Sequence, residues 1–143
     1  MRRLLVIVFL TFYLMAAKAQ TYSDAVTGVW ISGEGDGKIE VYKTGNKYFG
    51  KITWLKEPDD PDTGKPKLDD ENPNDDLQNK PVLGLVVLKN FVFADGFWQE
   101  GSIYDPANGR TYDCEMWLDG NNYLKIRGYW GFVYRTETWT RSR

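Results

Sequence analysis

The sequence contains no histidine and only one cysteine, Cys114, in 143 residues. The lack of histidine excludes Ser-His-Asp and Cys-His catalytic groups and removes the commonest ligand of zinc and copper. A single cysteine cannot form a disulfide within the chain, so packing must hold the fold together. We therefore predict no catalytic residues, no metal site and no cofactor, and we expect Cys114 to be a buried, inert thiol.

A long apolar run occurs only at the N-terminus. Residues 1–19 begin with two arginines after Met1, continue with the apolar run Leu4–Ala16 and end with Ala17-Lys18-Ala19, as in a secretory signal peptide. The apolar run is shorter than the roughly 20 residues of a membrane-spanning helix, which favours cleavage over an anchor. The sequence thus predicts a mature protein of residues 20–143, periplasmic or secreted, with no membrane span.

The mature protein also lacks an excess of positive charge. Residues 1–19 hold three of the 18 basic residues and none of the 20 acidic ones, so residues 20–143 carry a net charge of −5. This acidic balance argues against binding to nucleic acid or to anionic membranes.

No amphipathic helical pattern of useful length follows residue 20. Short runs of β-forming residues instead alternate with turn signals such as Asp95-Gly96, Asn108-Gly109 and Asp119-Gly120. This pattern predicts eight strands, at 26–32, 38–43, 47–56, 83–93, 97–104, 109–118, 123–129 and 132–141. Short antiparallel connections favour a single all-β domain, an eight-stranded up-and-down barrel, over a two-sheet sandwich.

One segment, residues 57–80, interrupts the strand pattern. It holds nine acidic residues and four of the six prolines, without apolar periodicity. A loop of this length in a compact domain is usually functional or mobile, and we expect a short helical turn at 75–78. No register of the loop satisfies the EF-hand pattern for calcium, so we interpret it as a long, solvated acidic loop.

The last hairpin contains the candidate ligand-binding residues. With Trp130-Gly131 as a two-residue turn, Tyr129 would face Phe132 and Arg127 would face Tyr134. If this face points inward, it would line a pocket for an anionic or amphipathic molecule, formed by Tyr104, Tyr112, Arg127, Tyr129 and Tyr134.

The opposite face of the hairpin is equally open to an inward position. It carries Leu124, Ile126, Gly128 and Val133, together with Arg135 and Glu137. If this face points inward, the aromatic and cationic face is an ordinary solvated surface. The sequence leaves both orientations open.

Six segments together resemble a family of small exported bacterial proteins, catalogued as domain of unknown function twenty-one forty-seven. They are Gly28-Val29-Trp30, Asp70-Glu71-Asn72-Pro73, Pro81–Leu85, Gly101–Tyr112, Leu124–Tyr129 and Trp139-Thr140-Arg141. The resemblance implies a lipocalin-like barrel, because Gly28-Val29-Trp30 is similar to the lipocalin Gly-x-Trp signature. It also implies that Arg141, or as second choice Arg135, packs across Trp30 and closes the barrel base. It places Asn72 in the long loop and implies no enzymatic activity.

Three functions are compatible with these features. The first is binding of a small hydrophobic or amphipathic molecule inside the barrel. The alternative is an envelope protein-interaction module with a filled barrel, whose contacts come from the 57–80 loop. An enzyme using strand carboxylates such as Glu100, Asp113, Glu115 and Glu137 is the least supported, because nothing in the sequence selects a pair.

Overall fold

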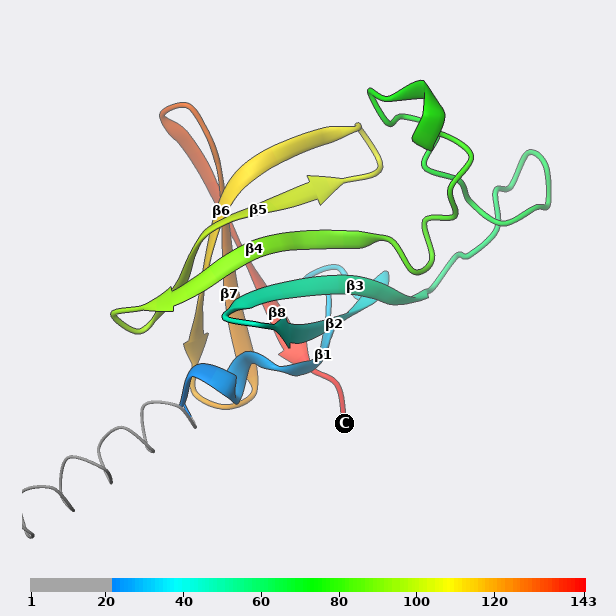
Figure 1. The fold of residues 1–143 in the computed structure, drawn as a ribbon. Helices are drawn as coiled ribbons and strands as arrows, with labels where there is room; N and C mark the ends of the chain where they lie inside the picture. The colour runs from blue at the N-terminus through cyan, green and yellow to red at the C-terminus, as the bar shows by residue number, and fades with distance from the viewer. Residues whose placement is uncertain (1–21) are drawn as a thin grey trace, which may run out of the picture.

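The computed structural model describes residues 22–143, in which eight antiparallel strands follow one another around a closed barrel (Figure 1). Strand β8 returns to pair with β1, where Trp30 lies opposite Arg141. The strands are β1 (Gly28–Ile31), β2 (Gly37–Thr44), β3 (Lys47–Leu55), β4 (Val86–Ala94), β5 (Phe97–Asp105), β6 (Arg110–Asp119), β7 (Tyr123–Trp130) and β8 (Val133–Arg141).

The predicted eight-stranded up-and-down barrel is confirmed, and the strand ends agree to within one residue except at the starts of β1 and β4. Val26 belongs to the short 3₁₀ helix η1 (Asp24–Val26) rather than to β1. Residues 83–85 precede β4, because the chain turns at Gly84 before it enters the regular ladder. The predicted signal peptide, residues 1–19, lies outside the described residues. Within residues 22–143, no helix has the length and apolar character needed to cross a membrane.

The interior is filled at one end by large aromatic side chains. Trp30, Trp98 and Phe91 are completely buried, and Tyr48 packs edge-on against Trp98 with ring centroids 6.3 Å apart. Strand β5 bends around this cluster through a register shift between Trp98 and Gly101, as β-bulges bend strands in small barrels. The bend brings Gly101 directly against the face of the Phe91 ring.

The segment around η1 closes the same end of the barrel. Its backbone carbonyls accept hydrogen bonds from two buried indoles, Trp30 Nε1 to Val26 O at 2.9 Å and Trp98 Nε1 to Ser23 O at 3.1 Å. Buried polar groups need such partners, because an unpaired donor in the interior costs its full desolvation penalty. The N-terminal segment is therefore part of the core and covers this end of the barrel.

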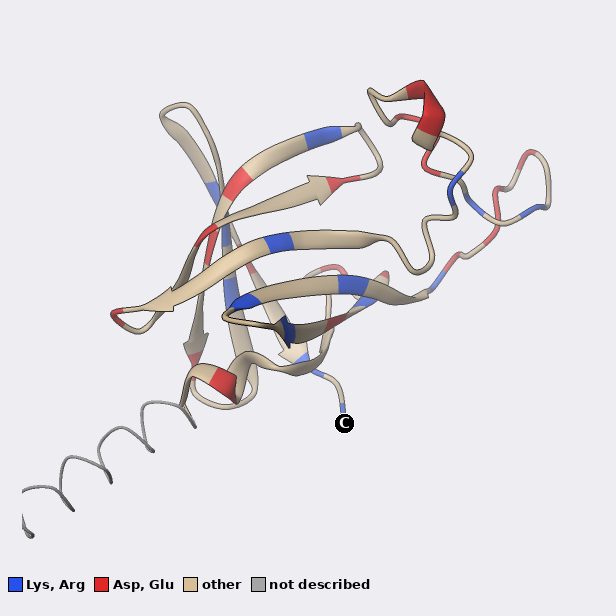
Figure 2. Cartoon of the chain, viewed as in Figure 1, with Lys and Arg blue, Asp and Glu red and all other residues tan. Residues whose placement is uncertain are grey.

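The long acidic segment, residues 56–85, extends from the opposite end of the barrel between β3 and β4 (Figure 1). It includes the short 3₁₀ helix η2 (Asp75–Leu77), which lies where the sequence predicts a helical turn. Acidic residues occupy η2 and recur along the rest of this loop, where basic residues lie between them (Figure 2). The turns β1–β2, β5–β6 and β7–β8 share this end of the barrel, as alternating strand directions require.

Cys114 lies on β6 with its side chain in the interior, only 4% exposed. Burial raises the pKa of the Cys114 thiol to about 12. A thiol that is inaccessible and protonated is neither a nucleophile nor a metal ligand at neutral pH. This agrees with the buried, inert thiol that the sequence predicts.

Candidate functional site

A cavity of about 610 Å³ opens at the end of the barrel that η1 does not close. Its inner wall is apolar and comes from inward-facing positions on β2 to β5, β7 and β8, namely Ile39, Ile52, Val87, Ile103, Ile126 and Trp139. These positions alternate along each strand with outward-facing residues, as the pleat of a barrel strand requires. The volume falls within the range of pockets that bind small molecules.

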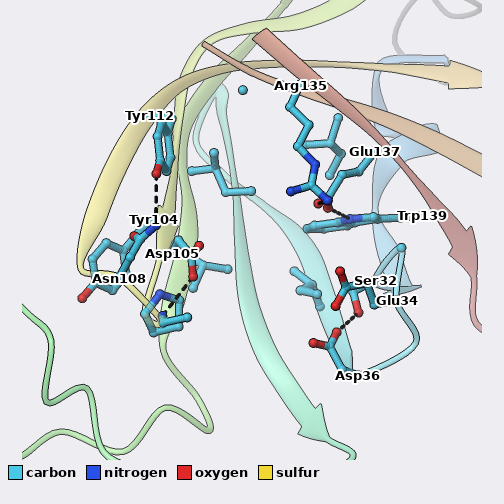
Figure 3. Close-up of a pocket in the computed structure, with 18 of the residues that line it drawn as sticks. Ser32, Glu34, Asp36, Tyr104, Asp105, Asn108, Tyr112, Arg135, Glu137 and Trp139 are labelled. Atoms are coloured by element: carbon cyan, nitrogen blue, oxygen red, sulfur yellow. Dashed lines mark hydrogen bonds and ion pairs between the residues drawn. The ribbon is translucent and has the colours of Figure 1, made fainter. Parts of the chain in front are cut away.

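The mouth of the cavity is polar and aromatic (Figure 3). On one side, the Arg135 guanidinium pairs with Glu137 at 3.5 Å, and Glu137 also accepts a bond from Trp139 Nε1 at 3.3 Å. Below them in the figure, Ser32 Oγ in the β1–β2 turn donates to Asp36 at 2.6 Å. The other side is formed by the β5–β6 hairpin. The cavity therefore has an apolar interior and a charged rim.

The register of the last hairpin differs from the predicted one by two residues. Tyr129 lies opposite Tyr134 and Trp130 opposite Val133, so the turn is Gly131-Phe132 rather than Trp130-Gly131. Gly131 has φ 59°, whereas Phe132 has no positive φ, as in a type II′ turn with glycine at its first central position. A two-residue turn starting at Trp130 would place the tryptophan where this geometry favours glycine.

The shift by two residues keeps each side chain on its face, and the structure places the second of the two faces inside. Leu124 and Ile126 are buried, and Gly128, Arg135 and Glu137 line the cavity. The face carrying Arg127 and Tyr129 points outward.

The two outward-facing candidates make contacts on the surface of the barrel. The guanidinium of Arg127 lies 4.9 Å from the Trp117 ring and bonds to Thr136 Oγ1 at 2.8 Å. Tyr129 donates its hydroxyl proton to Glu115, and this bond and burial raise the pKa of Tyr129. Neither side chain lines the cavity, so the prediction that they contact a ligand in the barrel is not supported by their position.

The remaining three candidates, Tyr104, Tyr112 and Tyr134, do line the cavity. Tyr134 belongs to the outward face, opposite Tyr129, and borders the rim of the cavity close to the hairpin tip, where it is more than half exposed. Tyr112 accepts a hydrogen bond from Asn108 Nδ2 at 3.1 Å. The structure thus brings three of the five predicted ligand-binding residues together at one opening.

Tyr104 also fastens the long loop to the barrel. Its hydroxyl donates to Asp69 Oδ1 at 2.6 Å, and Asn72 Nδ2 donates to Asp69 Oδ2 at 2.8 Å. Asp69 is completely buried, so these two donors offset the cost of removing a carboxylate from water. At Gly109, φ is 72° and a Cβ would overlap the carbonyl oxygen of Glu71. The loop residues near Asn72 therefore pack on the β5–β6 hairpin and hold one side of the mouth in place.

Replacing Tyr104 by phenylalanine is expected to lower the free energy of unfolding by about 2 kcal/mol at neutral pH, because it leaves an oxygen of the buried Asp69 without its donor. Burial and the bond to Asp69 raise the pKa of Tyr104 above its usual 10. The stabilisation by the hydroxyl is thus complete below about pH 10 and is lost as the pH rises further. Urea unfolding of wild type and variant from neutral to alkaline pH measures both effects.

The matched control is Tyr112→Phe, which removes a hydroxyl bonded to Asn108 in an exposed turn. We expect a change below about 0.5 kcal/mol for this control. The assigned role of Tyr104 would be contradicted if both variants unfolded alike, or if the difference between Tyr104→Phe and wild type did not narrow above about pH 10.

The predicted packing of Arg141 across Trp30, which closes the base of the barrel, is confirmed. The guanidinium lies 4.2 Å from the ring centroid of the buried indole. Its Nη1 and Nη2 atoms donate to the carbonyls of Thr27 and Ala25, and its Nε donates to Asn121. Partial burial lowers the pKa of Arg141, which still leaves arginine charged at neutral pH. The second choice, Arg135, instead lies at the mouth of the cavity.

Comparison with known proteins agrees with this geometry. The model of a bacterial family described as "Uncharacterized protein conserved in bacteria (DUF2147)" matches residues 28–141. The chain belongs to this family. The match spans the Trp30 and Arg141 base, the 56–85 loop and every strand that lines the cavity, so the whole barrel is the DUF2147 domain.

A solved structure shares the fold. It is described as protein HP1028 from the human pathogen Helicobacter pylori, belonging to the lipocalin family. It is 24% identical, with a TM-score of 0.70, and the similarity covers 82% of this chain and 83% of that chain. At this identity, the similarity establishes a lipocalin-like fold for this DUF2147 domain. No curated protein with a matching sequence was found.

Proposed function

We propose that this protein is an exported, non-enzymatic binding protein that holds one small hydrophobic or amphipathic molecule in its barrel. The observation that carries the proposal is the cavity of about 610 Å³, which has apolar walls and opens at the end of the barrel away from η1. Apolar ligand surface would leave water on entering it, at a gain of about 25 cal/mol per Å². Polar groups at the rim would orient the rest of the molecule.

The open cavity favours this function over the filled-barrel interaction module. In such a module, the aromatic packing seen around Trp30 and Trp98 would continue to the other end of the barrel. Beyond Trp139 the interior is instead unfilled. An enzymatic function is less supported, because the sequence has no histidine and the inward carboxylate Glu137 is paired with Arg135. Export is proposed from the signal-like residues 1–19.

A cavity-filling variant tests the proposal. Gly128 lies on the inner face of β7, where a Cβ would meet Ile103 and Tyr112 at an ordinary 3.8 Å, so a leucine there would project into the cavity. We expect the neutral fluorophore N-phenyl-1-naphthylamine to bind wild type at one saturable site. We expect Gly128→Leu to weaken this binding at least about tenfold, since the apolar site is occupied. Fluorescence titration measures both affinities.

The matched control is Thr140→Leu, which adds the same side chain to the exposed outer face of β8 and should leave the affinity unchanged. Ile103→Phe is a second cavity-filling variant, on β5, and circular dichroism establishes that each variant is folded. The proposal is wrong if wild type shows no saturable binding, or if folded Gly128→Leu and Ile103→Phe both bind the probe as wild type does.

A further inference from the structure

The charges that line the cavity are mainly negative. The lining includes four carboxylates and one cation, Arg135, which gives a formal balance of −3. The carboxylates are Glu34 and Asp36 in the β1–β2 turn, Asp105 at the end of β5 and Glu137 on β8. Gly33 in the turn lies against Glu137, since a Cβ placed on Gly33 would be 3.9 Å from Glu137 Oε2. The turn and β8 therefore bring their acidic residues to one side of the mouth.

Most of this negative charge is not compensated. Within residues 22–143, Glu34, Asp36 and Asp105 form no ion pair. The Asp36 carboxylate accepts a hydrogen bond from Ser32 Oγ, and the Asp105 carboxylate accepts one from the Ala107 amide. The pair between Arg135 and Glu137 is largely exposed on the arginine side, where 77% of the side chain is accessible. Arg135 therefore offsets one of the four negative charges, and three remain at the opening.

Aromatic rings surround the same opening. Tyr104, Tyr112, Trp130 and Tyr134 line the cavity close to its mouth. The negative face of an aromatic ring attracts ammonium and guanidinium groups, and aromatic cages bind quaternary ammonium ligands in this way. Two of these rings already contact cations of the protein itself, Trp130 with Arg110 at 4.4 Å and Tyr134 with Arg127 at 4.5 Å. The rim therefore presents both groups that recognise an organic cation, carboxylates and ring faces.

We propose that the ligand of this barrel is an amphipath with a positively charged amine or quaternary ammonium head, and this rests on the function proposed above. Its apolar part lies against Ile39, Ile126 and Trp139, and its cationic head lies at the rim among the carboxylates and aromatic rings. Such a head gains favourable interactions with both kinds of group. An anionic head meets the same four carboxylates, while Arg135 is the one cation among the residues that line the cavity, so the site disfavours fatty-acid-like ligands.

Three ligands with the same octyl chain test the head-group preference: octyltrimethylammonium, octanol and octanoate. Each competes with N-phenyl-1-naphthylamine for the wild-type barrel, at concentrations where the ligand does not self-associate. We expect the ammonium compound to bind at least about tenfold more tightly than octanoate, with octanol between them. Since the difference is electrostatic, it should shrink when NaCl is raised from about 20 mM to about 500 mM.

Charge variants assign the preference to the rim. The double variant Glu34→Gln/Asp36→Asn should reduce the ratio of ammonium to octanoate affinity several-fold, while octanol binds as it does to wild type. The control Asp95→Asn removes a carboxylate from the β4–β5 turn at the closed end. Its φ of 55° suits asparagine, and the affinity ratio should stay at the wild-type value.

The possible results separate the two proposals. If octanoate binds as tightly as octyltrimethylammonium or more tightly, the head-group inference is wrong and the binding function remains. It is also wrong if the ratio is the same in wild type and in the folded double variant. If neither the fluorophore nor any octyl compound binds, the proposed function and this inference are both overturned.

Discussion

Replacing Arg141 by alanine is expected to lower the free energy of unfolding by about 3 kcal/mol. The guanidinium donates to the carbonyls of Ala25, Thr27 and Asn121 and covers the ring of Trp30 at 4.2 Å. Charge-assisted hydrogen bonds are among the stronger polar contacts in proteins, and the cation–π contact adds to them. The substitution also releases the N-terminal segment that covers the base of the barrel. Chemical denaturation at neutral pH measures the change.

Two further variants separate the geometry of the guanidinium from its charge. Arg141→Lys keeps the charge but can donate to fewer of the three carbonyls, so we expect it to recover less than half of the loss. Arg143→Ala removes an exposed cation two residues further along and should change stability by less than about 0.5 kcal/mol. A loss below about 1 kcal/mol for Arg141→Ala would show that the base is held by other contacts.

Gly101→Ala is expected to cost about 3 kcal/mol, although it adds a single methyl group. A Cβ at Gly101 would overlap the ring of Phe91 on β4, which is completely buried. Overpacking of this kind forces side chains off their rotamers or shifts the backbone. Thermal and urea unfolding should both show the loss.

The control for Gly101→Ala is Gly128→Ala, on β7 of the same barrel. A Cβ there meets its neighbours at 3.8 Å, an ordinary contact, so the stability should change by less than about 1 kcal/mol. If overlap with the ring causes the loss, Gly101→Ala should cost less stability in a Phe91→Leu background than in the wild type. The steric explanation fails if Gly101→Ala unfolds at the wild-type midpoint.

The barrel itself could be predicted because its turns carry local signals. Asp95-Gly96 and Asp119-Gly120 each lie between two runs of alternating residues, and the structure has a hairpin at each. Turn residues and period-two alternation depend only on near neighbours, so a single sequence reveals them. The contact of Arg141 with Trp30 was expected from the resemblance to the lipocalin signature, and it could not be derived from local pattern alone.

The orientation of the last hairpin could not be predicted, because each of its faces mixes polar and apolar residues. Arg127 and Tyr129 alternate with Ile126 and Gly128, while Arg135 and Glu137 occupy inward positions. A cavity rim that needs charged groups removes the clean apolar signal that usually identifies the inner face. The charged residues on the inner face at the rim are thus the reason that the sequence pattern is ambiguous there.

The role of Asp69 was also missed. It is one of nine acidic residues in the 57–80 segment, and nothing near it in the sequence distinguishes it from the exposed ones. Its partner Tyr104 lies 35 residues further along the chain. Only the tertiary structure brings the two together, so the loop was predicted as solvated although one of its carboxylates is completely buried.

Because Cys114 is buried and is the one cysteine of the sequence, its reaction with a thiol reagent reports how often the native barrel opens. A thiol reagent reaches this side chain only when β6 separates from its neighbours, since the sulfur is buried and the sequence has no second cysteine to react first. Where the barrel recloses faster than the reagent reacts, the labelling rate follows the equilibrium population of open molecules. A bound molecule lowers that population in proportion to its occupancy, so the decrease in labelling rate would measure affinity without a dye, a tag or a substitution.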